Sequence, residues 1–266
     1  MDCQYPPGAA AGTLAMPDLL DRATRVGQAL LDLIYPPRCP GCGRMGFAFC
    51  ERCQAQVEPI TPPVCLRCGC ALPQRGLCSR CQTLPSSLDG ILAVAVFADP
   101  LRQAIHALKY ENNTTLAAPL GAMMVGFWQR GGLPQADLIV PVPLHSKRKA
   151  ERGYNQSSFL ARVVGRGVGV PVDDHTLIRQ RHTLPQVGLN FLERQRNVEG
   201  AFACRGDLKG KTVVVVDDVC TTGATLEACA TALRVGGASA VWAFTLARAR
   251  WDPGRSDAAP DAPPVG

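Results

Sequence analysis

Apolar positions along the chain alternate between short continuous runs and stretches with helical spacing. Four runs have the length and composition of buried strands: ILAVAVFA at 91–98, DLIVPVP at 137–143, TVVVVDD at 212–218 and AVWAFTLA at 240–247. Apolar residues three or four positions apart predict helices near 101–108, 116–127, 154–166 and 226–233. This alternation predicts an α/β fold whose mostly parallel sheet is covered by helices on both faces.

The rest of the chain divides by composition. The predicted parts are a disordered N-terminus at 1–16, a helix at 17–37, a cysteine-rich domain at 38–83, the α/β domain at 90–250 and a disordered tail at 251–266. Within the α/β domain, residues 172–211 are polar and irregular for their length, so we predict that part of them forms a mobile loop.

Eight cysteines of the cysteine-rich domain form four Cys-x2-Cys pairs: Cys39 with Cys42, Cys50 with Cys53, Cys65 with Cys68, and Cys78 with Cys81. Two such pairs supply the four thiolates of a tetrahedral zinc site, which leaves no open position for catalysis. We therefore predict structural zinc. The spacing does not decide whether one zinc ion is bound or two, nor whether the Cys-x2-Cys pairs combine in chain order or interleave. The alternative to zinc binding is that some of these cysteines are free, buried thiols. Cys70, a ninth cysteine, can compete with Cys68.

The net charge of +6 is concentrated in residues 145–196, which hold ten Lys and Arg against four acids. This surplus predicts an anionic ligand, with a solvated basic face as the alternative. No apolar run is long enough to span a membrane, and the N-terminus does not show a basic start followed by an apolar core, so we expect no secretory signal. Paired cysteines that bind metal suit a reducing compartment, so the predicted location is the cytoplasm.

The segment VVVVDDVCTTGAT at 213–225 combines a buried strand, two acids and a small polar turn into a helix. Backbone N–H groups at a helix N-terminus bind phosphate, with threonine hydroxyls as further donors. Adjacent carboxylates accept hydrogen bonds from vicinal ribose hydroxyls. The segment therefore predicts a site for a sugar 5-phosphate; acids that only cap a helix are the alternative.

This segment resembles the 5-phosphoribosyl-1-pyrophosphate (PRPP) binding motif of type I phosphoribosyltransferases. The chain as a whole resembles the ComF family, competence-associated proteins that join a zinc ribbon to a phosphoribosyltransferase domain. The resemblance rests on PPRCPGCG at 36–43 with the later cysteine pairs, ALKY at 107–110, VPVPL at 140–144, ERGYNQS at 151–157 and TLPQVGLNFLERQRNVEGAF at 183–202. It implies a type I phosphoribosyltransferase fold preceded by a double zinc ribbon. Cys220 stands where an aliphatic residue is more usual, and nothing after Trp251 matches.

The resemblance also implies roles for particular residues. Asp217 and Asp218 would hold the ribose hydroxyls as the catalytic pair. The PRPP-binding segment would be Val219, Cys220, Thr221, Thr222, Gly223, Ala224 and Thr225. The pyrophosphate, with its Mg²⁺, would lie at Pro143, Leu144, His145 and Ser146, near Lys147, Arg148 and Arg152. A mobile loop at roughly 179–197 would contribute Arg181, Thr183, Gln186, Arg194 and Asn197.

One of these segments has a simpler interpretation. In Arg152-Gly153-Tyr154-Asn155-Gln156, Asn155 can be a helix cap and Tyr154 a packing ring.

The resemblance implies displacement of pyrophosphate from the ribose anomeric carbon by an acceptor, commonly a nitrogen base, and a part in DNA uptake. Two alternatives stay open: a non-catalytic module that binds single-stranded DNA beside a helicase-like partner, and a PRPP sensor without turnover. Aromatic residues make up only 6% of the chain, which argues against a DNA-stacking platform. The sequence leaves open the acceptor, turnover and the oligomeric state.

Overall fold

A computed structural model describes residues 36–181 and 191–250. The predicted disordered ends lie outside these residues, as does nearly all of the predicted helix at 17–37, so those assignments stay predictions. Of the helices that the structure describes, none is long and apolar enough to cross a membrane.

The α/β domain is built on a four-stranded parallel sheet, in agreement with the prediction. The strands are β1 (Gly90–Val96), β2 (Leu138–Pro141), β5 (Thr212–Cys220) and β6 (Ala240–Arg248), in the order β1-β6-β5-β2. Pro141 pairs with Val216, so the carboxyl end of β2 lies directly beside the acids of β5.

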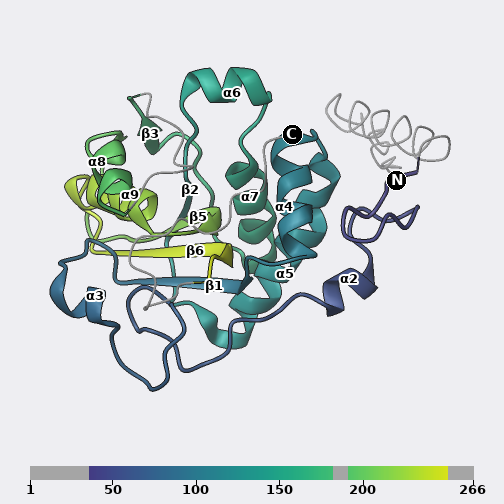
Figure 1. Ribbon diagram of the computed structural model, residues 1–266. Helices are drawn as coiled ribbons and strands as arrows, with labels where there is room; N and C mark the ends of the chain where they lie inside the picture. Colours follow the sequence, from purple (N-terminus) through teal and green to yellow (C-terminus); the bar gives the residue numbers. More distant parts are fainter. Residues whose placement is uncertain (1–35, 182–190, 251–266) are drawn as a thin grey trace, which may run out of the picture.

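Helices cover both faces of this sheet (Figure 1). One face packs against α4 (Leu101–Tyr110), α5 (Ala117–Phe127) and α7 (Gln156–Val168), with the short turns η1 (Thr114–Leu116) and η2 (Trp128–Gly132) at the ends of α5. The other packs against α9 (Ala224–Val235) and the neighbouring α8 (Phe191–Val198). Val214 and Val216 enter the first core, whereas Val213 and Val215 enter the second. A strand buried on both faces needs this unbroken valine run.

Two parts of the chain differ from the prediction. Within 172–211 the described residues, 172–181 and 191–211, include regular elements: β3 (Leu177–Arg179) and β4 (Phe202–Cys204) form an antiparallel pair, and α8 lies between them in sequence. Three-residue strands are too short to carry a periodic pattern. The basic stretch at 146–152 is also a helix, α6 (Ser146–Arg152), although it buries no side chain. Its N-terminus is capped by His145, whose Nδ1 accepts the Lys147 N–H at 3.3 Å.

The cysteine-rich domain contacts the α/β domain in two places. Its short helices α2 (Glu51–Ala55) and α3 (Ser79–Thr83) lie well apart, on either side of β1 (Figure 1). Cys39, Cys50 and Cys53 join the core under α4 and α5, and the five cysteines from Cys65 to Cys81 join the core under α9. The two halves of this domain therefore pack on opposite faces of the sheet.

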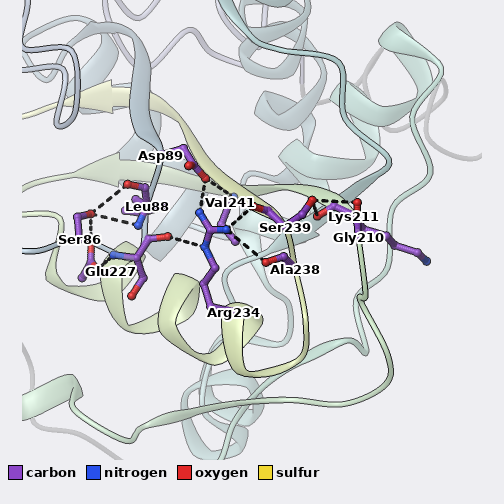
Figure 2. A network of polar contacts seen from close by, with 11 residues as sticks. Ser86, Leu88, Asp89, Gly210, Lys211, Glu227, Arg234, Ala238, Ser239 and Val241 are labelled. Atoms are coloured by element: carbon purple, nitrogen blue, oxygen red, sulfur yellow. Dashed lines mark hydrogen bonds and ion pairs between the residues drawn. The ribbon is translucent and has the colours of Figure 1, made fainter.

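A polar network fixes the linker between the cysteine-rich domain and β1 to helix α9 (Figure 2). Arg234 of α9 pairs with Asp89 Oδ2 at 2.5 Å and donates from Nε to the Ser87 carbonyl at 3.0 Å. Glu227, also on α9, accepts the Ser86 hydroxyl at 2.7 Å and the Ser87 N–H. The chain that leaves the second half of the cysteine-rich domain is thus held against both ends of α9, by Glu227 in its first turn and Arg234 in its last.

Candidate functional site

Asp218 lies at the carboxyl end of β5 and is almost fully buried, with 3% of its surface exposed. Its Oδ1 is 2.9 Å from Lys109 Nζ, at the end of α4. Its Oδ2 has no hydrogen-bond partner among the described residues. A buried carboxylate oxygen without a partner is uncommon, because leaving it unsatisfied costs free energy. This oxygen is therefore a buried acceptor that the described residues leave unsatisfied.

Asp217 is held by different partners from those of Asp218. The Ser157 hydroxyl, in the first turn of α7, donates to Asp217 Oδ1 at 2.7 Å, and the Asp218 N–H donates to the same oxygen at 2.9 Å. Burial and the neighbouring charge of Asp218 raise the pKa of Asp217 to about 7, against the opposing effects of Lys109 and Ser157. Asp217 therefore changes its charge near neutral pH.

We expect Asp218→Asn to lower the pKa of Asp217, because it removes the negative charge beside it. The measurement is a carboxyl ¹³C NMR titration of the ligand-free protein.

The same pKa makes stability depend on pH. In the wild type, the Asp217 carboxyl ionises near its ordinary pKa of 3.8 in the unfolded state and near 7 in the folded state. The folded state thus keeps a proton that the unfolded state has lost, so the stability contribution of Asp217 falls as pH rises from about 4 to 7. A wild-type titration near pH 4 would contradict this assignment.

The turn after β5 presents the N-terminus of α9. Gly223 is the N-cap residue, and its φ of +84° is a left-handed conformation that favours glycine. Glycine has no side chain to cap the first N–H groups of α9, which makes this end of the helix suitable for an anion. The Thr222 hydroxyl accepts the Ala224 N–H at 3.4 Å, and the Thr221 hydroxyl accepts from Arg194 Nη1 at 3.1 Å.

Two arginines that are distant in sequence, Arg194 and Arg179, lie near this turn and the acids. Arg194 of α8 is only 5% exposed and contacts the turn through Thr221. Arg179 of β3 is half-buried, and burial together with repulsion from Arg148 lowers its pKa, while Asp217 acts in the opposite direction. Part of the basic surplus predicted from the sequence is therefore gathered beside the acid pair. Lys147 and Ser146 are instead exposed on α6.

The segment 152–156 had a simpler interpretation, as a helix N-terminus with a packing ring, and part of it fits this interpretation. Asn155 is the N-cap of α7, and the Tyr154 ring packs against Phe159 with centroids 5.3 Å apart. The interpretation as a helix N-terminus with a packing ring is thus confirmed for these residues. The Arg152 guanidinium lies 5.1 Å from the ring centre of Tyr110, which is the residue after Lys109.

Some side chains of the predicted PRPP-binding segment belong to the core. The Cys220 thiol is buried and accepts from Arg248 Nη1 at 3.0 Å, and burial raises its pKa. Ala224, the first residue of α9, is buried in the core on that side of the sheet, and Val219 packs against the opposite core. Thr221, Thr222, Gly223 and Thr225 are half-exposed along the turn and the first residues of α9.

The predicted mobile loop is described only at its ends. Arg181 donates to the carbonyls of Asn197 and Glu199, at 3.1 and 2.5 Å, and so connects the end of β3 to the end of α8. Thr183 and Gln186 lie outside the described residues. Their assignment stays a prediction.

The sequence interpretation gave no role to three residues that the structure brings to the acids: Lys109, Ser157 and Arg179. Lys109 belongs to ALKY, and Ser157 to ERGYNQS, so the resemblance marked both segments without assigning these side chains. Arg179 was counted only in the basic surplus. No local pattern marks these contacts, because each partner comes from a different element.

The structure groups the eight paired cysteines into two quartets in chain order: Cys39, Cys42, Cys50 and Cys53, and Cys65, Cys68, Cys78 and Cys81. Within each quartet the sulfur atoms all lie within 4.8 Å of one another. The sulfur atoms of Cys42 and Cys50 are 3.5 Å apart, and those of Cys68 and Cys78 are 3.8 Å apart. Zinc–sulfur bonds of about 2.3 Å in a tetrahedron place sulfurs roughly 3.8 Å apart, so both quartets fit zinc. Cys70 is buried outside the second quartet.

Comparison with known proteins agrees with this architecture. Residues 30–82 match the double zinc ribbon domain, and residues 150–263 match the phosphoribosyl transferase domain, so this match continues past Trp251, where the sequence resemblance ended. The chain is 35% identical to the DNA utilization protein YhgH of Salmonella typhi, over 76% of this chain and 91% of that protein. It is 31% identical to competence protein F of Haemophilus influenzae, over 80% and 97% of the two chains.

A more distant relative is competence protein ComFC of Bacillus subtilis, with 25% identity over 75% of this chain and 83% of that protein. The matches extend over both the cysteine quartets and the α/β domain, and the first two relatives are covered almost completely. The chain therefore belongs to the ComF family, in which a double zinc ribbon precedes a phosphoribosyltransferase domain.

Proposed function

We propose that this protein binds PRPP together with Mg²⁺, with the 5-phosphate on the turn at 221–225 and the ribose hydroxyls on Asp217 and Asp218. The observation that carries the proposal is the second oxygen of Asp218. It is buried, it belongs to a carboxylate whose other oxygen contacts Lys109, and it has no partner among the described residues. A ribose hydroxyl would satisfy it.

The order of groups along the chain supports this orientation of the ligand. The acids end β5 and the open N-terminus of α9 follows within a few residues, so diol and phosphate sites are adjacent. Arg194 at Thr221 adds positive charge on the phosphate side. Arg179 and Arg148 interact electrostatically near Asp217, where the pyrophosphate group would extend.

The chemistry proposed for this site is transfer of the phosphoribosyl group: an acceptor nucleophile, commonly a nitrogen base, bonds to the ribose anomeric carbon as the bond from that carbon to pyrophosphate breaks and pyrophosphate leaves with the electron pair. Mg²⁺, when bound with PRPP, neutralises charge on the pyrophosphate. As the bond to pyrophosphate breaks, positive charge builds on the ribose ring, and the carboxylates of Asp217 and Asp218 would stabilise it. Lys109 pairs with Asp218, and the Ser157 hydroxyl holds Asp217 in place.

The relatives' names suggest the biological setting. Proteins named for competence and DNA utilization share the full arrangement of this chain. We therefore infer a role in the handling of DNA taken up from outside the cell, with PRPP as the small-molecule ligand. The alternative is that the basic residues of segment 145–196 bind the phosphates of single-stranded DNA.

The first test is calorimetric titration of the zinc-loaded protein with PRPP and Mg²⁺. We expect saturable binding, and a loss of about a hundredfold in affinity for the Asp217→Asn, Asp218→Asn double variant, because two hydrogen bonds to charged acceptors are lost. The matched control changes the other adjacent pair, Asp173→Asn with Asp174→Asn; those carboxylates bind Thr176 and Arg162 instead. Equal affinity of the wild type and the Asp217/Asp218 variant would refute the proposed site.

Further titrations separate an enzyme from a binding module. Acceptor-dependent release of pyrophosphate from PRPP indicates turnover. Binding without release indicates a sensor. Binding of single-stranded DNA that weakens steeply with salt supports the DNA alternative.

A further inference from the structure

The two cysteine quartets are held by similar backbone structures. The second pair of each quartet opens a five-residue helix whose N-cap is a cysteine, Cys50 for α2 and Cys78 for α3. In each, the glutamine after the last cysteine donates to a carbonyl just before the helix, at 2.7 Å for Gln54 and 3.1 Å for Gln82. We call the segments 39–53 and 65–81 the first and second knuckles.

Each knuckle carries an arginine directly before its last cysteine. Arg52 of the first knuckle is exposed. Arg80 of the second knuckle is half-buried, and its Nη2 donates to the carbonyl of Thr222 at 3.2 Å, across 142 positions of sequence. Equivalent positions in two similar knuckles thus have different surroundings, and only Arg80 contacts the turn at the N-terminus of α9.

A second connection joins the same two regions through β1. The Ile91 N–H donates to the Arg67 carbonyl in the second knuckle at 2.7 Å. A Cβ added to Gly69 would meet the Ile91 carbonyl at 2.5 Å, so the backbones are in close contact there. A Cβ added to Gly223 would lie 3.2 Å from the Ile91 Cδ1. Ile91 is therefore packed between the second knuckle and the turn.

A small pocket marks this junction. Its volume is about 60 Å³, and its lining includes Arg67, Arg80, Thr222, Gly223 and Glu227. Glu227 also anchors the linker that leaves the second knuckle, through Ser86 (Figure 2). The second knuckle, its linker and the first turn of α9 thus form one packed unit.

The contact of Arg80 has a direct consequence for the turn. In a planar trans peptide, the carbonyl and the following N–H point in opposite directions. Holding the Thr222 carbonyl on Arg80 therefore directs the Gly223 N–H away from the second knuckle. A cationic donor on that carbonyl also polarises the same peptide group, which strengthens its N–H as a donor. Gly223 alone would leave this peptide free to rotate, since glycine has little conformational preference.

We propose that Arg80 is a positioning residue of the 5-phosphate turn, through which the second knuckle becomes part of the PRPP site. The inference rests on the proposed function. It makes the two zinc sites unequal: the second one supports ligand affinity, and the first one supports only the fold around α4.

The experiment compares Arg80→Ala, Arg80→Lys and the matched control Arg52→Ala by calorimetry, each checked for full zinc content. We expect Arg80→Ala to weaken PRPP binding about tenfold and Arg80→Lys to weaken it less, because lysine retains one cationic donor. Arg52→Ala should stay within about twofold of the wild type. Affinity for pyrophosphate with Mg²⁺ should not change in any variant, since that group does not use the turn.

Equal PRPP affinity in Arg80→Ala and Arg52→Ala would overturn the inference. A parallel loss of pyrophosphate affinity would also overturn it, because it would show general damage to the domain. A wild type that binds no PRPP would refute the proposed function. In that case hydrogen exchange of the ligand-free protein still tests Arg80: amides at 221–226 should exchange faster in Arg80→Ala than in Arg52→Ala. Equal exchange rates would refute the positioning role.

Discussion

Removal of zinc is expected to unfold the cysteine-rich domain while the parallel sheet keeps its structure. Between residues 38 and 83, the only buried apolar side chain besides the cysteines, among the described residues, is Phe49. A segment with so small a core depends on its metal for stability. Structural zinc in comparable small domains contributes on the order of 10 kcal/mol of binding free energy, which is lost on chelation.

Metal analysis and hydrogen exchange test this expectation together. We expect two zinc ions per chain, and a loss of exchange protection across 38–83 after chelation, with protection retained in β5 and β6. The matched pair of variants is Cys81→Ser, which should lose one zinc ion, and Cys70→Ser, which should lose none because Cys70 lies outside the second quartet. Unchanged protection after complete zinc removal would show that the domain folds without metal. Zinc loss in Cys70→Ser would make that thiol a ligand.

Lys109→Met is expected to destabilise the folded protein by about 3 kcal/mol, because it leaves Asp218 buried without its cation. The pair is 2.9 Å apart, and the Asp218 side chain is only 4% exposed. Burial by itself lowers the pKa of Lys109, but the charges of Asp218 and Asp217 outweigh it and raise the pKa above 10.5. Lys109 therefore stays protonated at neutral pH. Urea unfolding of the ligand-free protein measures the change in free energy.

A double-mutant cycle isolates the pair from other effects of the substitution. Asp218→Asn in the Lys109→Met background removes the unpaired charge, so the double variant should be more stable than Lys109→Met alone. Lys149→Met is the control, since Lys149 is exposed on α6 and should change stability by less than about 0.5 kcal/mol. If Lys109→Met were no less stable than this control, the ion pair would contribute nothing to the fold.

The sequence alone determined the features whose signal is local. The valine run of β5 and the alternation of strands and helices predicted the parallel α/β sheet, because a strand buried on both faces must be apolar throughout. The spacing of the cysteine pairs predicted zinc, since a knuckle closes within a few residues. The acids and the Thr-Thr-Gly turn marked the candidate site for the same reason: its central groups are neighbours in the chain.

Tertiary structure decided which distant groups complete that site. Lys109 reaches Asp218 from α4, and Arg80 reaches Thr222 from the cysteine-rich domain. It also decided the chain-order pairing of the cysteines and the short elements α6, β3 and β4, which carry no periodic pattern. Such contacts depend on how helices pack against a twisted sheet. The free energy that selects them comes from burial and charge pairing across the fold, which no short stretch of sequence records.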